Sequence, residues 1–338
     1  MDGIAWLGVI GFALAAYSVV ANDAIQTLGT FLRSNQHRPW WLLWLFAAGI
    51  LVAVMVLGFY GQNTDIAFGR LNQIPFPDTG IQWYHIIPPA VLIVLTRTSI
   101  PVSTTFLVLT MFALTGGAAT EGVMGKMLMK SALGYLVAFG TGALIYALVS
   151  RSYSRWVDRT EPQSFWYPLQ WATTAFLWWQ WLEQDLANIF VFLPRQTIET
   201  ADGVQVLIPG ATVFWGGFLA VGLLAYTFWR RGGAIQAIVN AKTNTNDPRV
   251  GTLIDVMFGL ILFIFKEISD IPMSTTWVFM GLIAGRELMV SFVGGLRDRA
   301  EATRDVTRDG ARLLFGLVVS VALAFFIPWA ATGVMPTF

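Results

Sequence analysis

The chain has 338 residues, of which 56% are hydrophobic and only 12% are charged, and its net charge is +1. Soluble domains carry about 25% charged residues, so this composition excludes an ordinary soluble protein, and the low net charge gives no basis for binding nucleic acid. The absence of cysteine excludes disulfides and thiol chemistry, and two histidines are too few for a haem or zinc centre. The apolar residues form blocks of about 20, the length that crosses a bilayer as a helix. We therefore expect an all-α polytopic membrane protein embedded in the lipid bilayer.

The first apolar segment contains an acidic interruption. It extends over 3–33, and Asn22 and Asp23 stand inside it. A carboxylate at membrane depth is energetically unfavourable and indicates a functional site. We interpret this segment as a broken transmembrane helix. A continuous apolar span at 40–60 and a polar loop at 61–83 follow it.

A proline followed by hydroxyl residues divides the next apolar stretch. The motif Pro-x-Ser-Thr-Thr occupies 101–105, and the apolar segments on its two sides are each short for a span. Proline removes a backbone donor and the hydroxyls compete for backbone groups, so a continuous helix is disfavoured here. We expect a re-entrant hairpin with its tip at this motif, either buried in protein or lining a cavity. A span at 130–149 completes the first half.

The same order of features recurs in the second half. An apolar segment at 166–193 is interrupted at Glu183, Gln184 and Asp185. The remaining segments are a loop at 194–208, a span at 211–229, a basic loop at 230–250, a hairpin with its tip at 272–276, a charged stretch at 297–312 and a last span at 313–331.

This recurrence predicts two repeats, 1–149 and 150–338. Each repeat crosses the membrane an odd number of times, so the second must be inserted upside down relative to the first. Inverted repeats with broken helices that meet near the bilayer midplane are typical of secondary transporters. We expect alternating access around a site that both repeats form.

Basic residues are unevenly distributed between the two faces that this topology defines. The loops at 32–39, 150–163, 230–250 and 297–312 share one face and carry 14 of the 21 lysines and arginines, whereas the opposite face carries four. The positive-inside rule places the first face in the cytoplasm. We expect a multi-pass protein of the plasma membrane with both termini outside. The faces would be the same if each hairpin crossed fully, so the charge distribution does not establish re-entrance.

The two hydroxyl motifs and the two interrupted helices offer complementary groups. Each tip provides hydroxyl donors and begins a half-helix, whose N-terminus favours an anion. A small tetrahedral oxyanion suits such a cage, while the carboxylates suit an accompanying Na⁺ or H⁺. We predict that the oxyanion contacts Asn22, Asp23, Ser103, Thr104, Thr105, Gln184, Asp185, Ser274, Thr275 and Thr276.

Other charged residues lie outside these motifs. Glu267 and Glu287 are candidate ligands of the coupling cation, beside the possible Na⁺ site at Asp23 and Asp185. Asp255, near the entry of the second hairpin, is expected at a membrane interface. Several roles stay open, those of Arg97, Lys266, Asp270 and Arg286, although Lys266 and Asp270 are four apart and suited to neutralise each other.

The motifs together resemble those of the inorganic phosphate transporter (PiT) family. Val20-Ala21-Asn22-Asp23 looks like the family's Gly-Ala-Asn-Asp signature, and Gln184-Asp185-Leu186-Ala187-Asn188 is similar to its second copy. The two Pro-x-Ser-Thr-Thr motifs resemble the family's paired hairpin motif, and the set covers about 3–334 in the family's order. The resemblance implies Na⁺- or H⁺-coupled phosphate uptake by a homodimer. It places phosphate at the hydroxyl tips and the Asn-Asp pair, and the cation near the two aspartates and the retained Asn188.

The chain also departs from the family pattern. Glutamine replaces the usual asparagine at two positions, phenylalanine and tryptophan replace the histidine after each hydroxyl triplet, and isoleucine replaces the glycine before each proline; these positions are Gln26, Gln184, Phe106, Trp277, Ile100 and Ile271. Some members of the family carry sulfate, so sulfate or another tetrahedral oxyanion is the alternative substrate. A passive anion channel is less favoured because of the intramembrane carboxylates. We expect no catalytic residues and no cofactor, because the chain has neither a cysteine nor a histidine near the tips that a membrane enzyme could use.

Overall fold

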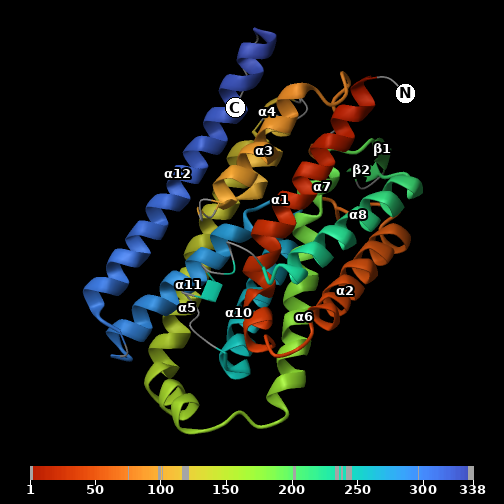
Figure 1. Ribbon diagram of the computed structural model, residues 1–338. Helices are drawn as coiled ribbons and strands as arrows, with labels where there is room; N and C mark the ends of the chain where they lie inside the picture. Colours follow the sequence, from red (N-terminus) through yellow and green to blue (C-terminus); the bar gives the residue numbers. More distant parts are fainter. Residues whose placement is uncertain are drawn as a thin grey trace.

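The structure of the chain is a computed structural model that describes residues 3–74, 76–97, 100, 102–115, 122–200, 203–232, 236, 239–240, 246–295 and 297–333. Pro101 of the first predicted tip and part of the basic loop at 230–250 lie outside the described residues. The molecule is a helix bundle with one small two-stranded hairpin (Figure 1).

Within the described residues, the first half contains five α-helices and one π-helical stretch. These are α1 (Gly3–Ser34), α2 (Trp40–Gly61), α3 (Trp83–Arg97), the π-helical η1 (Thr105–Leu109), α4 (Thr110–Thr115) and α5 (Val123–Arg159). The second half contains α6 (Trp166–Asp185), α7 (Ala187–Phe190), β1 (Gln196–Thr200), β2 (Gly203–Leu207), α8 (Gly210–Trp229), α10 (Pro248–Ile268), α11 (Thr275–Phe292) and α12 (Arg299–Thr332).

Within the described residues, six helices are long and apolar enough to cross a membrane, which makes the chain a multi-pass membrane protein. They are α1, α2, α5, α8, α10 and α12. Since α10 has 21 residues and α3 has only 15, the two hairpins differ in the length of their first arm. Re-entrance of the hairpins therefore stays a prediction.

The prediction of a break at the first acidic interruption, in α1, is wrong. The break at the second interruption, after α6, is small. Helix α1 continues through Asn22 and Asp23 without a break. Between α6 and α7 only Leu186 interrupts the helix, and it keeps helical dihedral angles and a backbone hydrogen bond of 3.1 Å to Leu182. The reason is that the polar side chains find partners on other segments, so the backbone does not have to unwind to satisfy them.

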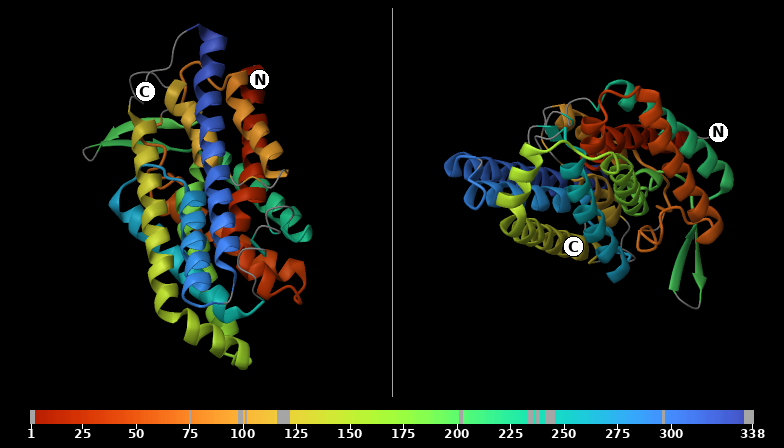
Figure 2. Two further views of the ribbon diagram at one scale, coloured as in Figure 1. Left: turned by 90° about the vertical axis from the view of Figure 1, so that its left-hand side faces the viewer. Right: turned by 90° about the horizontal axis from the view of Figure 1, so that it is seen from below.

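Three segments that were expected to be loops or separate stretches form regular secondary structure. Helix α5 extends through most of the loop predicted at 150–163, and α12 joins the charged stretch and the last span into one helix of 34 residues. The loop predicted at 194–208 contains the antiparallel pair β1–β2, which projects from the bundle (Figure 2). Residues 196–199 of β1 are exposed, whereas Val206 of β2 is buried.

Glycines allow the closest helix contact in the molecule, between α5 and α11. A Cβ at Gly281 would lie 2.4 Å from the Tyr135 carbonyl oxygen, and one at Gly285 would lie 2.2 Å from that of Phe139. On α5, Gly142 has the same relation to Leu282. Small residues spaced four apart bring helix backbones together in membranes, where packing must replace the hydrophobic effect.

The two hairpins pack in corresponding ways. The first arms lie against earlier helices, α3 against α1 and α10 against α6. The second arms pack on more distant helices, so that α11 packs on α5 while η1 and α4 pack on α12. Helix α12 lies on one side of the bundle, and α2 and α8 pair on the opposite side (Figures 1 and 2). Helix α1 begins and α12 ends at the same end of the bundle (Figure 1).

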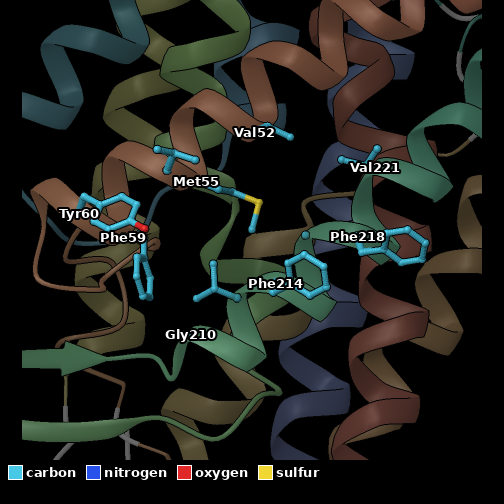
Figure 3. A pocket seen from close by; sticks show the side chains of 11 residues that line it. Val52, Met55, Phe59, Tyr60, Gly210, Phe214, Phe218 and Val221 are labelled. Atoms are coloured by element: carbon cyan, nitrogen blue, oxygen red, sulfur yellow. The ribbon is translucent and has the colours of Figure 1, made fainter.

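The helix pair α2–α8 encloses an apolar groove on the outside of the bundle. It has a volume of about 440 Å³, and Met55, Phe59, Phe214 and Phe218 are among its lining residues (Figure 3). Such a surface suits lipid chains and offers nothing to an anion. The candidate site lies elsewhere, where the two hairpin tips meet.

Candidate functional site

Both hairpin tips donate to one carboxylate. The Thr276 hydroxyl at the start of α11 donates to Asp23 Oδ1 at 3.0 Å, and the Thr104 hydroxyl before η1 donates to Asp23 Oδ2. All three residues are about 99% buried, with 1% of each exposed. Helix α1 and the tips of both hairpins therefore meet at a single acidic side chain.

Asn22 and Gln26 hold this carboxylate from its own helix. Asn22 Nδ2 donates to Asp23 Oδ1 at 2.8 Å and to the Val102 carbonyl oxygen at 2.8 Å, so it also ties α1 to the first tip. Gln26 Nε2 donates to Asp23 Oδ1 at 3.3 Å. Gln26, one of the departures from the family pattern, thus belongs to the cluster.

Asn188, on α7, extends the network to Asp185 at the end of α6. Its Nδ2 donates to Asp185 Oδ1 at 2.7 Å and lies 3.3 Å from the hydroxyls of both Thr104 and Thr105. The Thr105 hydroxyl in turn donates to the Met273 carbonyl oxygen at 3.2 Å, in the second tip. Asp23 and Asp185 are thereby joined through one buried chain of polar groups.

The two serines of the tips act as helix caps. Ser103 Oγ accepts from the backbone N–H of Phe106 at 3.1 Å, and Ser274 Oγ accepts from that of Trp277 at 3.1 Å. Capping satisfies a backbone donor that the first turn of a helix leaves unpaired. The hydroxyl of Thr275 accepts from Trp181 Nε1 at 3.2 Å.

Three predicted site residues lie apart from the cluster. Gln184 Nε2 donates to the Leu262 carbonyl oxygen at 3.0 Å, so it braces α6 against α10. Glu267 is exposed and lies 3.6 Å from Lys266, while Glu287 forms an ion pair with Arg297. Lys266 pairs with Glu183 at 2.6 Å, so the expected pairing of Lys266 with Asp270 is wrong. The charge on Lys266 is therefore neutralised inside the bundle by a residue of α6.

Several oxygen atoms of the cluster are buried without a hydrogen-bond donor in the described part of the chain. They are Asn22 Oδ1, Asp185 Oδ2 and Asn188 Oδ1. Buried polar groups are nearly always satisfied, so orphaned acceptors point to a missing partner. Oxygen atoms of this kind are the ligands that a small hard cation takes.

Asp255 is a buried carboxylate that sequence reasoning misplaced. It was expected at an interface, yet it is fully buried, with Thr30 Oγ1 at 2.8 Å and Thr174 Oγ1 at 2.5 Å. Thr30 lies two turns after Asp23 and Thr174 three turns before Asp185, on the same helix faces. That spacing is the signal by which the position of Asp255 between α1 and α6 could have been found.

Two cationic side chains near the second tip were also missed. Arg70, in the loop after α2, donates from Nη1 to the Ser269 carbonyl oxygen at 2.6 Å, and Lys130 donates to the same oxygen at 2.5 Å. Burial lowers the pKa of the Arg70 guanidinium, and Asp270 counteracts that effect. No pattern in the sequence indicates that these residues from two distant segments converge on one carbonyl group.

Comparison with known proteins gives a fold. No family model matches the sequence, and no curated protein matches it. One solved structure, described as "The sodium-dependent phosphate transporter", is similar with a TM-score of 0.62 and 14% sequence identity, over 99% of this chain and 100% of that chain. The chain therefore has the fold of that transporter along its whole length.

Proposed function

We propose that the protein is a secondary active transporter that imports inorganic phosphate by symport with Na⁺ or H⁺. The observation that carries this proposal is the meeting of both hairpin tips on Asp23, in the same buried network as Asp185. The fold shared with a sodium-dependent phosphate transporter supports it, as do the motifs that resemble the PiT family. Membership of that family is part of the proposal.

The anion would be held by the hydroxyl groups of the tips. Thr104 and Thr276 donate to Asp23, and a tetrahedral oxyanion offers them alternative acceptors. The first backbone N–H groups of α11 add to this, because a helix N-terminus attracts negative charge. Phosphate is the primary substrate that we propose, and sulfate is the alternative with the same geometry.

The cation would balance the two carboxylates. Among the described residues, neither Asp23 nor Asp185 forms an ion pair, although both are buried. An unpaired charge in such a place is unstable, so a carboxylate there takes up a proton or a metal cation. The orphaned oxygens of Asn22, Asp185 and Asn188 support a bound cation beside the anion site. Glu267 and Glu287 have no part in this proposal.

Burial of the whole cluster corresponds to a closed state. Transport then requires the tips to separate from α1 on one side and later on the other, in the alternating access typical of inverted repeats. We further propose that the protein is a homodimer in the plasma membrane, with its basic loops in the cytoplasm and both termini outside.

The test is uptake of labelled phosphate and labelled sulfate into proteoliposomes, each under an imposed Na⁺ or H⁺ gradient. The proposal predicts phosphate uptake that requires one of these gradients. Uptake of sulfate alone would select the alternative substrate. Uptake that ignores both gradients would indicate a passive channel, and a failure to move either anion would refute the substrate class.

A further inference from the structure

Two buried cationic side chains share one acceptor at the turn before the second tip. Arg70 Nη1 and Lys130 Nζ both donate to the Ser269 carbonyl oxygen, and Lys130 also donates to that of Ile271 at 2.9 Å. Arg70 is 1% exposed and Lys130 is 8% exposed. Like charges placed together in a poorly solvated position repel each other strongly. The carbonyl dipoles offset this only in part, so the pair favours an additional anion.

Arg70 has an unused edge. Its Nε and Nη2 are buried and have no hydrogen-bond partner in the described part of the chain. The N–H bonds of these two atoms point to the same side of the planar guanidinium, which is the edge that binds a carboxylate or phosphate with two parallel hydrogen bonds. Buried charged donors without an acceptor are costly, so this edge indicates a ligand.

A second buried arginine shows the contrast. Arg195 donates a hydrogen bond from Nη1 to the Val191 carbonyl oxygen at 2.7 Å and another from Nη2 to that of Ile74 at 2.6 Å. Both of its terminal nitrogens are used to hold backbone, as expected of a structural residue. Arg70 uses only Nη1 in this way.

Carboxylates lie near Arg70 but, within the described residues, do not accept hydrogen bonds from its Nε and Nη2. Asp270 has the largest electrostatic influence on it, followed by Glu183 and Asp185, but none of them forms an ion pair with it among the described residues. Asp270 is exposed and packs beside Gly69, where a Cβ would lie 3.1 Å from its Cγ atom.

We propose that Arg70 and Lys130 form an entry site that binds a tetrahedral oxyanion before it reaches the hydroxyl tips. This inference rests on the proposed function and adds a site to it. The anion takes two hydrogen bonds from the free edge of Arg70 and a charge contact from Lys130. Because the same two cations hold the turn at Ser269 and Ile271, an anion bound beside them offsets part of the charge that attracts these two carbonyl oxygens and loosens the second tip. Anion binding is thereby linked to the opening of the central cluster.

The test compares Arg70→Gln and Arg70→Lys with the unmodified protein. Labelled phosphate uptake in proteoliposomes gives KM and kcat, and calorimetric titration of the detergent-purified protein with inorganic phosphate gives Kd. Loss of two charge-assisted hydrogen bonds should raise KM and Kd about 10- to 100-fold, while kcat changes less than about twofold. Arg70→Lys keeps the charge and the reach to Ser269 but lacks the paired edge, so it should show folding like that of the unmodified protein and a raised KM.

Asp270→Asn is the matched control. If Asp270 were the true partner of the free edge, its loss would weaken phosphate binding as much as Arg70→Gln does. An anion site predicts the opposite sign, because a competing carboxylate has been removed: KM should be unchanged or lower. A raised KM in Asp270→Asn would overturn the entry site.

The outcomes separate this inference from the proposed function. Phosphate uptake with an unchanged KM in both Arg70 variants would overturn the entry site and leave the transporter intact. If the unmodified protein binds phosphate without transporting it, the same comparison is made with Kd, and an unchanged Kd again overturns the entry site. If the unmodified protein binds neither phosphate nor sulfate, both proposals fail.

Discussion

Replacement of Asp23 by asparagine should abolish coupled uptake while leaving the fold in place. Oδ1 of Asp23 accepts from Asn22, Gln26 and Thr276, and an asparagine oxygen can take that position. The amide nitrogen of the new asparagine then faces Thr104, whose hydroxyl can accept a hydrogen bond instead of donating one. Only the charge-dependent part of these bonds is lost, so the free energy of unfolding should change by about 2 kcal/mol or less.

The effect on transport should be much larger. Removing one charged partner from a buried ion pair costs about 3–5 kcal/mol, which corresponds to a loss of more than about 100-fold in cation affinity. The assay is gradient-driven uptake of labelled phosphate, with thermal unfolding of the purified variant measured in parallel. Asp255→Asn is the matched control, since Asp255 is equally buried and is also held by two threonine hydroxyls, Thr30 and Thr174. It should retain coupled uptake. Uptake by Asp23→Asn equal to that of the control would refute the reasoning.

Three further predictions concern other parts of the site and its scaffold. Asp185→Asn should also abolish coupled uptake with little change in unfolding temperature, and normal cation dependence would contradict its place in the network. Ser103→Ala and Ser274→Ala should each reduce stability by about 1 kcal/mol through loss of a cap, with uptake retained; a complete loss of transport would show that these hydroxyls bind substrate directly. Gly285→Val should force α5 and α11 apart and lower the unfolding temperature strongly, whereas Gly140→Val, where no atom lies within 4 Å, should not; equal effects would argue against the close contact.

The central meeting point could be predicted because its signals are local. Two Pro-x-Ser-Thr-Thr motifs and two acidic interruptions stand out against long apolar runs, and the structure brings Asp23, Thr104, Thr276 and Asn188 together. The lengths of the apolar runs also indicated the candidate spans. The two-repeat division and its inverted insertion remain predictions.

The rest could not be predicted because it depends on partners far away in the sequence. Polar residues inside α1 suggested a break, but the first tip satisfies Asn22 through Val102, so the helix stays intact. Gln184 stands where the family usually has asparagine and was expected to contact the anion, yet it turns to the backbone of α10 at Leu262. Arg70 and Lys130 lie in a loop and in a long helix, and only folding places them on the same carbonyl group.

The most direct measurement of the central claim is accumulation of labelled phosphate in proteoliposomes with equal phosphate on both sides at the start. The account predicts that an inward Na⁺ or H⁺ gradient drives internal phosphate above the external concentration, and that collapsing the gradient returns it to equality. Because both tips meet on Asp23, the same experiment with Asp23→Asn should show no accumulation. Phosphate that never exceeds the external concentration under either gradient, or that accumulates equally in the variant, would contradict the account.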